Sequence, residues 1–184
     1  MNFIKSDISG IVIIEPKVFG DSRGFFMESF HKTRFEENGI NEEFVQDNVS
    51  RSTRGTLRGL HYQMNPNAQG KLVRVSVGEV YDVAVDIRKG SPTFGRYVGI
   101  ILSEENKKMM YVPAGFAHGF IVLSDVAEFT YKCTNYYAPQ SEKSILWSDP
   151  TIGIEWPIQP DIDKISNKDK MGSFLNDAEN NYQF

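Results

Sequence analysis

The segment Lys71–Ile87 reads KLVRVSVGEVYDVAVDI and contains the plainest structural signal in this chain. Val, Ile and Tyr are frequent in it, and these residue types favour β-strands. Gly78 divides the segment at a position typical of a tight turn. The pattern therefore predicts two strands, Lys71–Val77 and Glu79–Ile87, that follow each other directly.

Similar segments continue on both sides of this pair. Turn-forming residues, such as Lys89-Gly90-Ser91-Pro92, separate them at a spacing of about 8 to 12 residues. Many short strands at this spacing, with almost no helix between them, indicate an antiparallel sandwich or barrel, and their number favours a jelly roll. The other predicted strands are Ile11–Ile14, Phe25–Phe30, Phe44–Ser50, Thr56–Gln63, Arg96–Leu102, Lys108–Val112, Gly119–Leu123 and Glu128–Thr134.

Helices are expected only at the periphery of this mainly β fold. Residues 31–38 form the best helix candidate, because Asn38-Gly39 is a typical helix end. From Pro139 onward the chain is rich in proline, which predicts irregular chain with short helices wrapped on the barrel. The polar residues 176–184 are expected to fray.

Length and composition narrow the class of protein. The 184 residues predict a single domain, 1–184, that is large enough for a substantial core. The net charge of -4 argues against broad nucleic-acid binding, yet a few local cations suffice for one nucleotide diphosphate.

Cys133 is the only cysteine, so no intrachain disulfide can form. We see no signal peptide and no membrane span, which predicts a cytosolic protein without a membrane partner.

The stretch Arg58–Gln63, RGLHYQ, places a histidine close to an arginine in one predicted strand. His61 is a natural proton carrier near neutral pH, and Arg58 offers a planar fork for carboxylates or phosphates. Two interpretations stay open: proton abstraction from a phosphorylated small molecule, or a core histidine beside a surface ion pair. Alternation along the strands allows His61 and Lys71 to point into the same barrel mouth.

A metal site is the first alternative chemistry. His61 is followed by Tyr62-Gln63, which is not the His-x-His pair common in jelly-roll metalloproteins. His31 falls in the predicted helix and is expected to be solvated. His61 and His118 are too few for a three-histidine site, so no metal is expected unless carboxylates complete one.

Other side chains each have a structural and a functional interpretation. His118 lies between glycine-containing segments and either caps a turn or donates to a phosphate or substrate oxygen. Tyr131 either packs with its hydroxyl satisfied or protonates a carbanion in a closed pocket. Cys133 has no base partner in the sequence and is interpreted as packing. Tyr136-Tyr137 either covers a barrel end or stacks on a flat ring.

Eight motifs, taken in their order along the chain, resemble the dTDP-4-dehydrorhamnose 3,5-epimerase family. The resemblance covers about residues 3–170, and the ordered set is far more specific than any single motif. These motifs are Gly24-Phe25-Phe26, Phe44-Val45-Gln46-Asp47-Asn48, Arg58–Gln63, Gly70-Lys71-Leu72-Val73, Val85-Asp86-Ile87-Arg88, Phe116-Ala117-His118-Gly119-Phe120, Tyr131-Lys132-Cys133-Thr134 and Gly153-Ile154-Glu155-Trp156-Pro157.

The resemblance implies a cupin-like jelly roll that works as a homodimer without metal or organic cofactor. It implies that His61 is the catalytic base, that Asp169 orients it, that Tyr131 is the acid on the opposite face, and that Lys71 stands beside the enolate. The Pro expected soon after the Asp is missing in Lys170–Phe174. The implied substrate-binding residues are Arg23, Glu28, Gln46, Asp47, Asn48, Arg58, Lys71, His118, Glu142 and Lys168, with Tyr137 stacking on thymine.

The chemistry of a 4-keto sugar agrees with this assignment. Carbons 3 and 5 flank the ketone, so loss of a proton from either gives an enolate, and no hydride moves. The expected function is epimerisation of dTDP-4-dehydro-6-deoxy-D-glucose at both carbons to give dTDP-4-dehydro-L-rhamnose. The presence of both His61 and Tyr131 is taken to favour double epimerisation over a mono-epimerase or a ketoisomerase. A sugar-binding or regulatory module without catalysis is the non-enzyme alternative.

Overall fold

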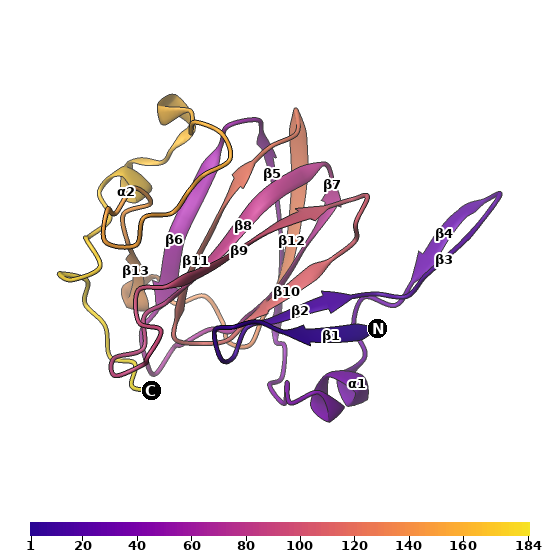
Figure 1. Ribbon diagram of the computed structural model, residues 1–184, viewed down its shortest axis with the longest axis horizontal. Coiled ribbons are helices and arrows are strands. Elements are labelled where there is room, and N and C mark those ends of the chain that lie inside the picture. Colours follow the sequence, from indigo (N-terminus) through magenta and orange to yellow (C-terminus); the bar gives the residue numbers. More distant parts are fainter.

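Two antiparallel sheets face each other in the computed structural model, which describes residues 1–184 (Figure 1). The first sheet has the strand order β1 (Asn2–Lys5), β2 (Val12–Glu15), β10 (Met109–Val112), β7 (Lys71–Val77), β12 (Val126–Cys133) and β5 (Gln46–Thr53). The second has the order β13 (Glu142–Ser144), β6 (Leu57–Gln63), β11 (Phe116–Val122), β8 (Glu79–Asp86) and β9 (Tyr97–Ser103). This arrangement confirms the predicted antiparallel jelly roll.

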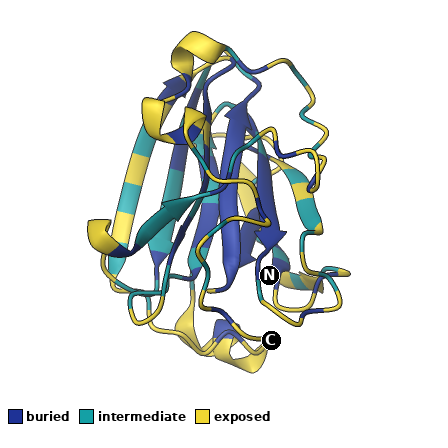
Figure 2. Cartoon of the chain, turned by 90° about the vertical axis from the view of Figure 1, so that its left-hand side faces the viewer, coloured by how far each residue is buried: buried dark blue, intermediate teal, exposed yellow.

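The main core lies between the two sheets. Val73 and Val75 of β7 are buried against Phe129 of β12 and Phe120 of β11, and the Phe120 and Phe129 rings stack at 4.2 Å. The predicted inner face of β7 is therefore correct. Figure 2 shows the central strands buried, while most exposed residues lie on the helices and loops around them. Lys71 begins β7 on the same face as Val73, at the point where the core gives way to a cavity.

Close contact between β6 and β11 sets the position of the two histidines. The strands pair His61 with His118, and their register shifts between His118 and Phe120. A side chain at Gly119 would meet the Arg58 carbonyl oxygen at 2.7 Å, so only glycine allows this approach. The backbone at position 59 has φ +130°, a conformation that side-chain-bearing residues rarely adopt and that also favours glycine.

Short helices and one hairpin complete the structure. The hairpin of β3 (Val18–Asp21) and β4 (Gly24–Met27) projects away from both sheets (Figure 1). His31 is the exposed residue before α1 (Lys32–Glu37). The observed helix therefore begins one residue later than the predicted helix over 31–38. Two 3-10 turns (Pro139–Ser141, Ile162–Lys164) and α2 (Asn167–Lys170) follow, and no helix is long and apolar enough to span a membrane.

The predicted elements need two corrections. β1, β3 and β13 were not expected, because each is short and its residues lack a strong β pattern; β1 and β13 form by pairing at a sheet edge, and β3 forms by pairing with β4. The expected fraying of 176–184 is wrong. Tyr182 is only 6% exposed and Gln183 bridges Lys89, because the polar tail finds hydrogen-bond partners on the barrel.

We expect Gly119→Ala to lower the free energy of unfolding by about 1–3 kcal/mol, because its Cβ must push two backbones apart. Urea denaturation measures the change. Gly20→Ala is the matched control, since a Cβ there meets only the Gly24 carbonyl oxygen at 3.7 Å. Equal stability of the two variants would contradict the tight contact between β6 and β11.

Candidate functional site

A cavity of about 300 Å³ opens between the two sheets at the end where β6 stops and β7 begins. Its size is at the lower end of the range for small-ligand sites. Polar side chains from both sheets converge on it. It is lined by Gln46, Asn48, His61, Tyr62, Gln63, Gln69, Lys71, Val112, Phe116, His118, Tyr131, Tyr137 and Glu142.

His61 and Asp169 form the central polar contact of this site. His61 Nε2 lies 2.6 Å from Asp169 Oδ1. Asp169 is buried on α2, where its backbone N–H donates to the Ser166 side chain that caps the helix. Burial alone would raise the pKa of Asp169, but hydrogen bonds from His61 and the Gly59 N–H outweigh it and lower the pKa. Asp169 is therefore a carboxylate at neutral pH.

Tyr131 and Lys71 approach the cavity from the opposite sheet. Burial raises the pKa of the Tyr131 phenol, so it remains protonated at neutral pH. Burial lowers the pKa of the Lys71 amine, while the nearby Cys133, Glu142 and Asp82 partly offset that effect. The cavity thus has a histidine on one wall and a proton donor on the other.

His118 lies in β11 and does not cap a turn, which corrects one of its two interpretations. Its Nε2 lies 2.9 and 3.1 Å from the two carboxylate oxygens of Asp82, which is fully buried. Burial raises the pKa of Asp82, and His118 and Lys71 reduce that effect. Asp82 was not among the predicted site residues, although a carboxylate between the apolar residues of β8 is an unusual signal.

The open end of the cavity contains a second polar group. The Tyr137 hydroxyl donates to Glu142 Oε2 at 2.7 Å, and Lys168 forms an ion pair with the same carboxylate. The Tyr137 backbone N–H donates to Gln46 Oε1 at 2.9 Å. Tyr137 is 54% exposed, so its ring is accessible at the cavity rim.

Gln63 and Gln69 are two further lining residues that sequence analysis missed. Gln63 is buried, and its side chain contacts the backbone on both sides of Tyr137. Glutamines of this kind carry no recognisable spacing, so no sequence signal marked them.

Not every predicted site residue reaches the cavity. Asp47 points to the outer side of β5 and pairs with Lys132 at 2.9 Å. Arg23 lies at the tip of the β3–β4 hairpin, 88% exposed and paired with Asp21. Glu28 follows the hairpin and pairs with Arg34. Arg58 lies beside the cavity, where its Nε donates to Ser52 Oγ.

The histidines and carboxylates do not assemble a metal centre. No group of three or more His, Cys, Asp or Glu side chains is arranged to hold a metal ion. His61 and His118 are each engaged by one carboxylate, Asp169 and Asp82 respectively. Each histidine is thus oriented by its own carboxylate, and the two are not arranged as ligands of one metal ion.

Comparison with known proteins places this cavity in context. Residues 5–177 match the sequence model of the dTDP-4-dehydrorhamnose 3,5-epimerase family. The chain is 61% identical over 180 residues to the dTDP-4-dehydrorhamnose 3,5-epimerase of Shigella flexneri, covering 97% of this chain and 98% of that protein.

Solved structures agree with the fold. One is the dTDP-6-deoxy-D-glucose-3,5-epimerase of Legionella pneumophila in complex with dTDP-4-keto-L-rhamnose, with TM-score 0.94, 55% identity, and 100% and 99% coverage of the two chains. Another is a 3'-monoepimerase of Streptomyces bikiniensis in complex with dTDP-quinovose, with TM-score 0.86, 36% identity, and 93% and 86% coverage.

A variant of that monoepimerase replaces one His by Asn and one Tyr by Phe. Such a His and Tyr therefore also occur in a mono-epimerase, so the presence of His61 and Tyr131 does not by itself indicate double epimerisation. The match over residues 5–177 and the 61% identity nevertheless establish the family: this chain belongs to the dTDP-4-dehydrorhamnose 3,5-epimerases, which are isomerases.

Proposed function

We propose that this protein epimerises dTDP-4-dehydro-6-deoxy-D-glucose at carbons 3 and 5 to give dTDP-4-dehydro-L-rhamnose, without metal or organic cofactor. The observation that carries the proposal is the placement of His61 and Tyr131 on opposite walls of one cavity. Removal of a proton from one face and its return from the other is the requirement of an epimerase. The relatives named for this reaction support the choice of substrate.

His61 is the base. Because Asp169 is ionised and can only accept, the Nε2–H of neutral His61 donates to it, and Nδ1 carries the free lone pair. His61 Nδ1 takes the proton from carbon 3 or 5, and the C–H electron pair forms the enolate with the 4-keto oxygen. Asp169 then stabilises the resulting imidazolium, which is the same role that the carboxylate plays in other His-based sites.

Lys71 stabilises the enolate, and Tyr131 completes the inversion. A cation in a cavity with little water strongly stabilises a developing oxyanion. The Tyr131 phenol gives its proton to the carbon from the face opposite His61. The new C–H bond consumes the enolate electron pair and restores the ketone, so no oxidation or reduction occurs. Solvent then returns the two residues to their starting protonation states.

The nucleotide lies at the open end of the cavity. Tyr137 stacks on thymine, and Lys168 and Arg58 face the diphosphate, which needs cationic partners. Gln46, Asn48 and His118 bind polar groups of the substrate inside the cavity, and Glu142 holds Tyr137 and Lys168 in place.

The active form is a homodimer in which the β3–β4 hairpin reaches the site of the partner. The hairpin exposes Phe19, Phe25 and Phe26 at 54%, 59% and 68%, which is an unusual amount of apolar surface on a projecting arm. Arg23 and Glu28 are implied substrate-binding residues that lie outside the cavity of their own chain. A two-fold arrangement delivers both residues to the second cavity.

A mono-epimerase acting at carbon 3 is the second candidate, favoured by the similar fold of the 3'-monoepimerase. The two candidates differ in the carbons that exchange protons with solvent. A cytosolic location and the absence of nucleic-acid or membrane partners stay predictions.

In D₂O, the wild-type protein is expected to introduce deuterium at both carbon 3 and carbon 5 of dTDP-4-dehydro-6-deoxy-D-glucose, as followed by NMR and mass spectrometry. His61→Ala should slow exchange at both carbons, and Tyr131→Phe should impair mainly carbon 5 while binding is spared, each by about 10²- to 10⁴-fold. His31→Ala and Tyr136→Phe are matched controls on exposed residues. Label at carbon 3 alone identifies a mono-epimerase, and no label despite binding leaves a sugar-binding module.

Lys71→Met should abolish most turnover yet raise the free energy of unfolding at pH 7 by about 1 kcal/mol, because a buried ammonium is replaced by an apolar chain. The pKa of Lys71 is lower in the folded state than its ordinary 10.5, so the ammonium destabilises the fold at neutral pH. That cost fades as the pH rises toward 10.5. Denaturation at pH 7 and pH 10 measures it, and a less stable Lys71→Met variant at pH 7 would contradict the argument.

Mixing the Arg23→Ala and His61→Ala variant proteins tests whether Arg23 completes the cavity of the partner subunit. If Arg23 acts in the partner's cavity, each mixed dimer has one complete site, and random mixing restores about a quarter of wild-type turnover. If Arg23 acts within its own chain, the mixture stays as inactive as its components. Size-exclusion chromatography with light scattering verifies that dimers form and exchange.

A further inference from the structure

The C-terminal segment Asn176–Phe184 is bound to the barrel along much of its length. It runs beside β6 and β13 at one end of the sheets (Figure 1). The Lys89 N–H donates to the Tyr182 carbonyl oxygen at 3.1 Å, and the Phe184 N–H donates back to the Lys89 carbonyl oxygen at 3.0 Å. Tyr182 is buried although its neighbours are polar.

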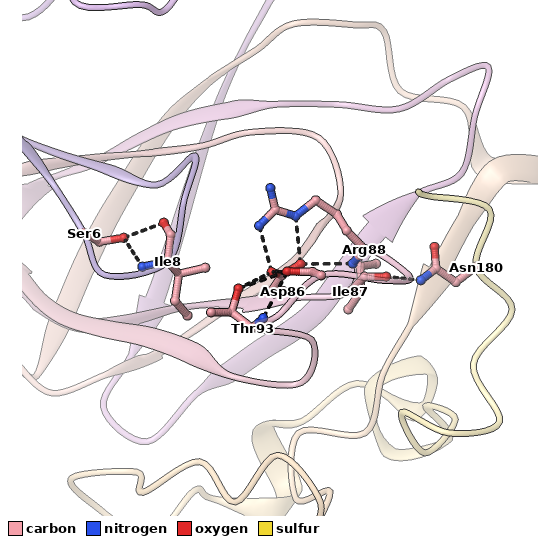
Figure 3. Close-up of polar contacts among 8 residues, drawn as sticks. Ser6, Ile8, Asp86, Ile87, Arg88, Thr93 and Asn180 are labelled. Atoms are coloured by element: carbon pink, nitrogen blue, oxygen red, sulfur yellow. Dashed lines mark hydrogen bonds and ion pairs between the residues drawn. The ribbon is translucent and has the colours of Figure 1, made fainter. Parts of the chain in front are cut away.

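Arg88 anchors the end of this segment. Asp86 accepts hydrogen bonds from Arg88 Nε at 2.8 Å and Nη2 at 2.7 Å and from the Thr93 hydroxyl (Figure 3). The Ser91 hydroxyl donates to the same carboxylate. The guanidinium so held lies 4.5 Å from the Phe116 ring centroid and 4.9 Å from that of Phe184. These hydrogen bonds offset the effect of burial and lower the pKa of Asp86 to about 2. Asn180 also donates to the Ile87 carbonyl oxygen (Figure 3).

The middle of the segment contacts the strand that carries His61. The Tyr182 hydroxyl donates to the Gln63 carbonyl oxygen, and the Tyr62 hydroxyl donates to the Glu179 carbonyl oxygen. Burial raises the pKa of Tyr182 to about 12, so its phenol remains a donor. Just beyond the strand, Asn65 and Asn181 exchange two hydrogen bonds at 3.0 and 3.1 Å.

Gln63 connects the C-terminal segment to the cavity rim, because its backbone contacts Tyr182 and its side chain contacts the rim. Its side-chain amide donates to the Tyr136 carbonyl oxygen at 3.2 Å, and its amide oxygen accepts from the Ala138 N–H at 2.7 Å. Both residues next to Tyr137 are therefore fixed by one side chain. Asp169, in contrast, is positioned by α2 and by Ser166, which caps that helix. The contacts between Asn176–Phe184 and the barrel involve neither of these.

We propose that Asn176–Phe184 is a strap that positions Tyr137 for nucleotide binding, with Tyr182 as the positioning residue that acts through Gln63. The inference rests on the proposed function, in which Tyr137 stacks on thymine. It assigns the strap to affinity for the nucleotide and not to proton transfer. Loosening the strap is thus expected to raise KM and the Kd for dTDP while leaving kcat and its pH profile unchanged.

The test compares Tyr182→Phe and Phe184→Ala with the control Gln183→Ala, which changes only an exposed side chain of the same segment. Calorimetry with dTDP gives Kd, and deuterium exchange into the 4-keto sugar gives kcat and KM across pH. We expect a rise of about three- to tenfold in Kd and KM for both test variants, the size of one lost hydrogen bond or ring contact. Gln183→Ala should match wild type.

Unchanged Kd and KM in Tyr182→Phe and Phe184→Ala would overturn the strap, as would a loss of kcat or a shifted pH profile at unchanged Kd. Circular dichroism and urea denaturation verify that each variant is folded; Tyr182→Phe keeps the buried ring and therefore the packing. If the wild-type protein shows no proton exchange, the proposed function fails, while dTDP affinity still reports on the strap.

Discussion

The contact between His61 and Asp169 joins residues that are 108 positions apart in the chain, and the rest of the site is arranged around it. It needs β6 to present His61 on the inner face and α2 to return Asp169 to that strand. The Gly59 N–H, only two residues from His61, also approaches the Asp169 carboxylate at 3.4 Å. Strand and helix are therefore fixed to each other by the same carboxylate, which restricts the imidazole to one orientation.

Burial acts differently on each ionisable group of the cavity. It raises the pKa of Tyr131 and keeps a proton on the phenol, whereas it lowers the pKa of Lys71 and makes its charge costly. For Asp169 the hydrogen bonds from His61 and Gly59 reverse the effect of burial. One wall thus carries a histidine oriented by a carboxylate and the other a protonated phenol, which is a separation that acid–base chemistry could use.

The scaffold leaves part of its predicted site incomplete within one chain. The barrel supplies His61, Lys71, Tyr131 and the rim that contains Tyr137, whereas Arg23 projects on a hairpin with exposed phenylalanines. At the other end, the tail that was expected to fray is held by Arg88 and Tyr182. In the proposed function, residues outside the two sheets therefore bind the nucleotide, while His61, Lys71 and Tyr131 lie on strands.

Sequence by itself determined the mainly antiparallel architecture and the inner face of β7, because strand alternation is a local property of the backbone. It allowed a shared cavity for His61 and Lys71, and the structure shows that both residues line one cavity. The resemblance of ordered motifs also pointed to Asp169, which no spacing would have connected with His61. Tertiary structure alone revealed Asp82 beneath His118, the buried Tyr182 and the distance of Arg23 from the cavity. These features depend on which distant segments meet and on how much water they exclude, and neither quantity is encoded in a local pattern.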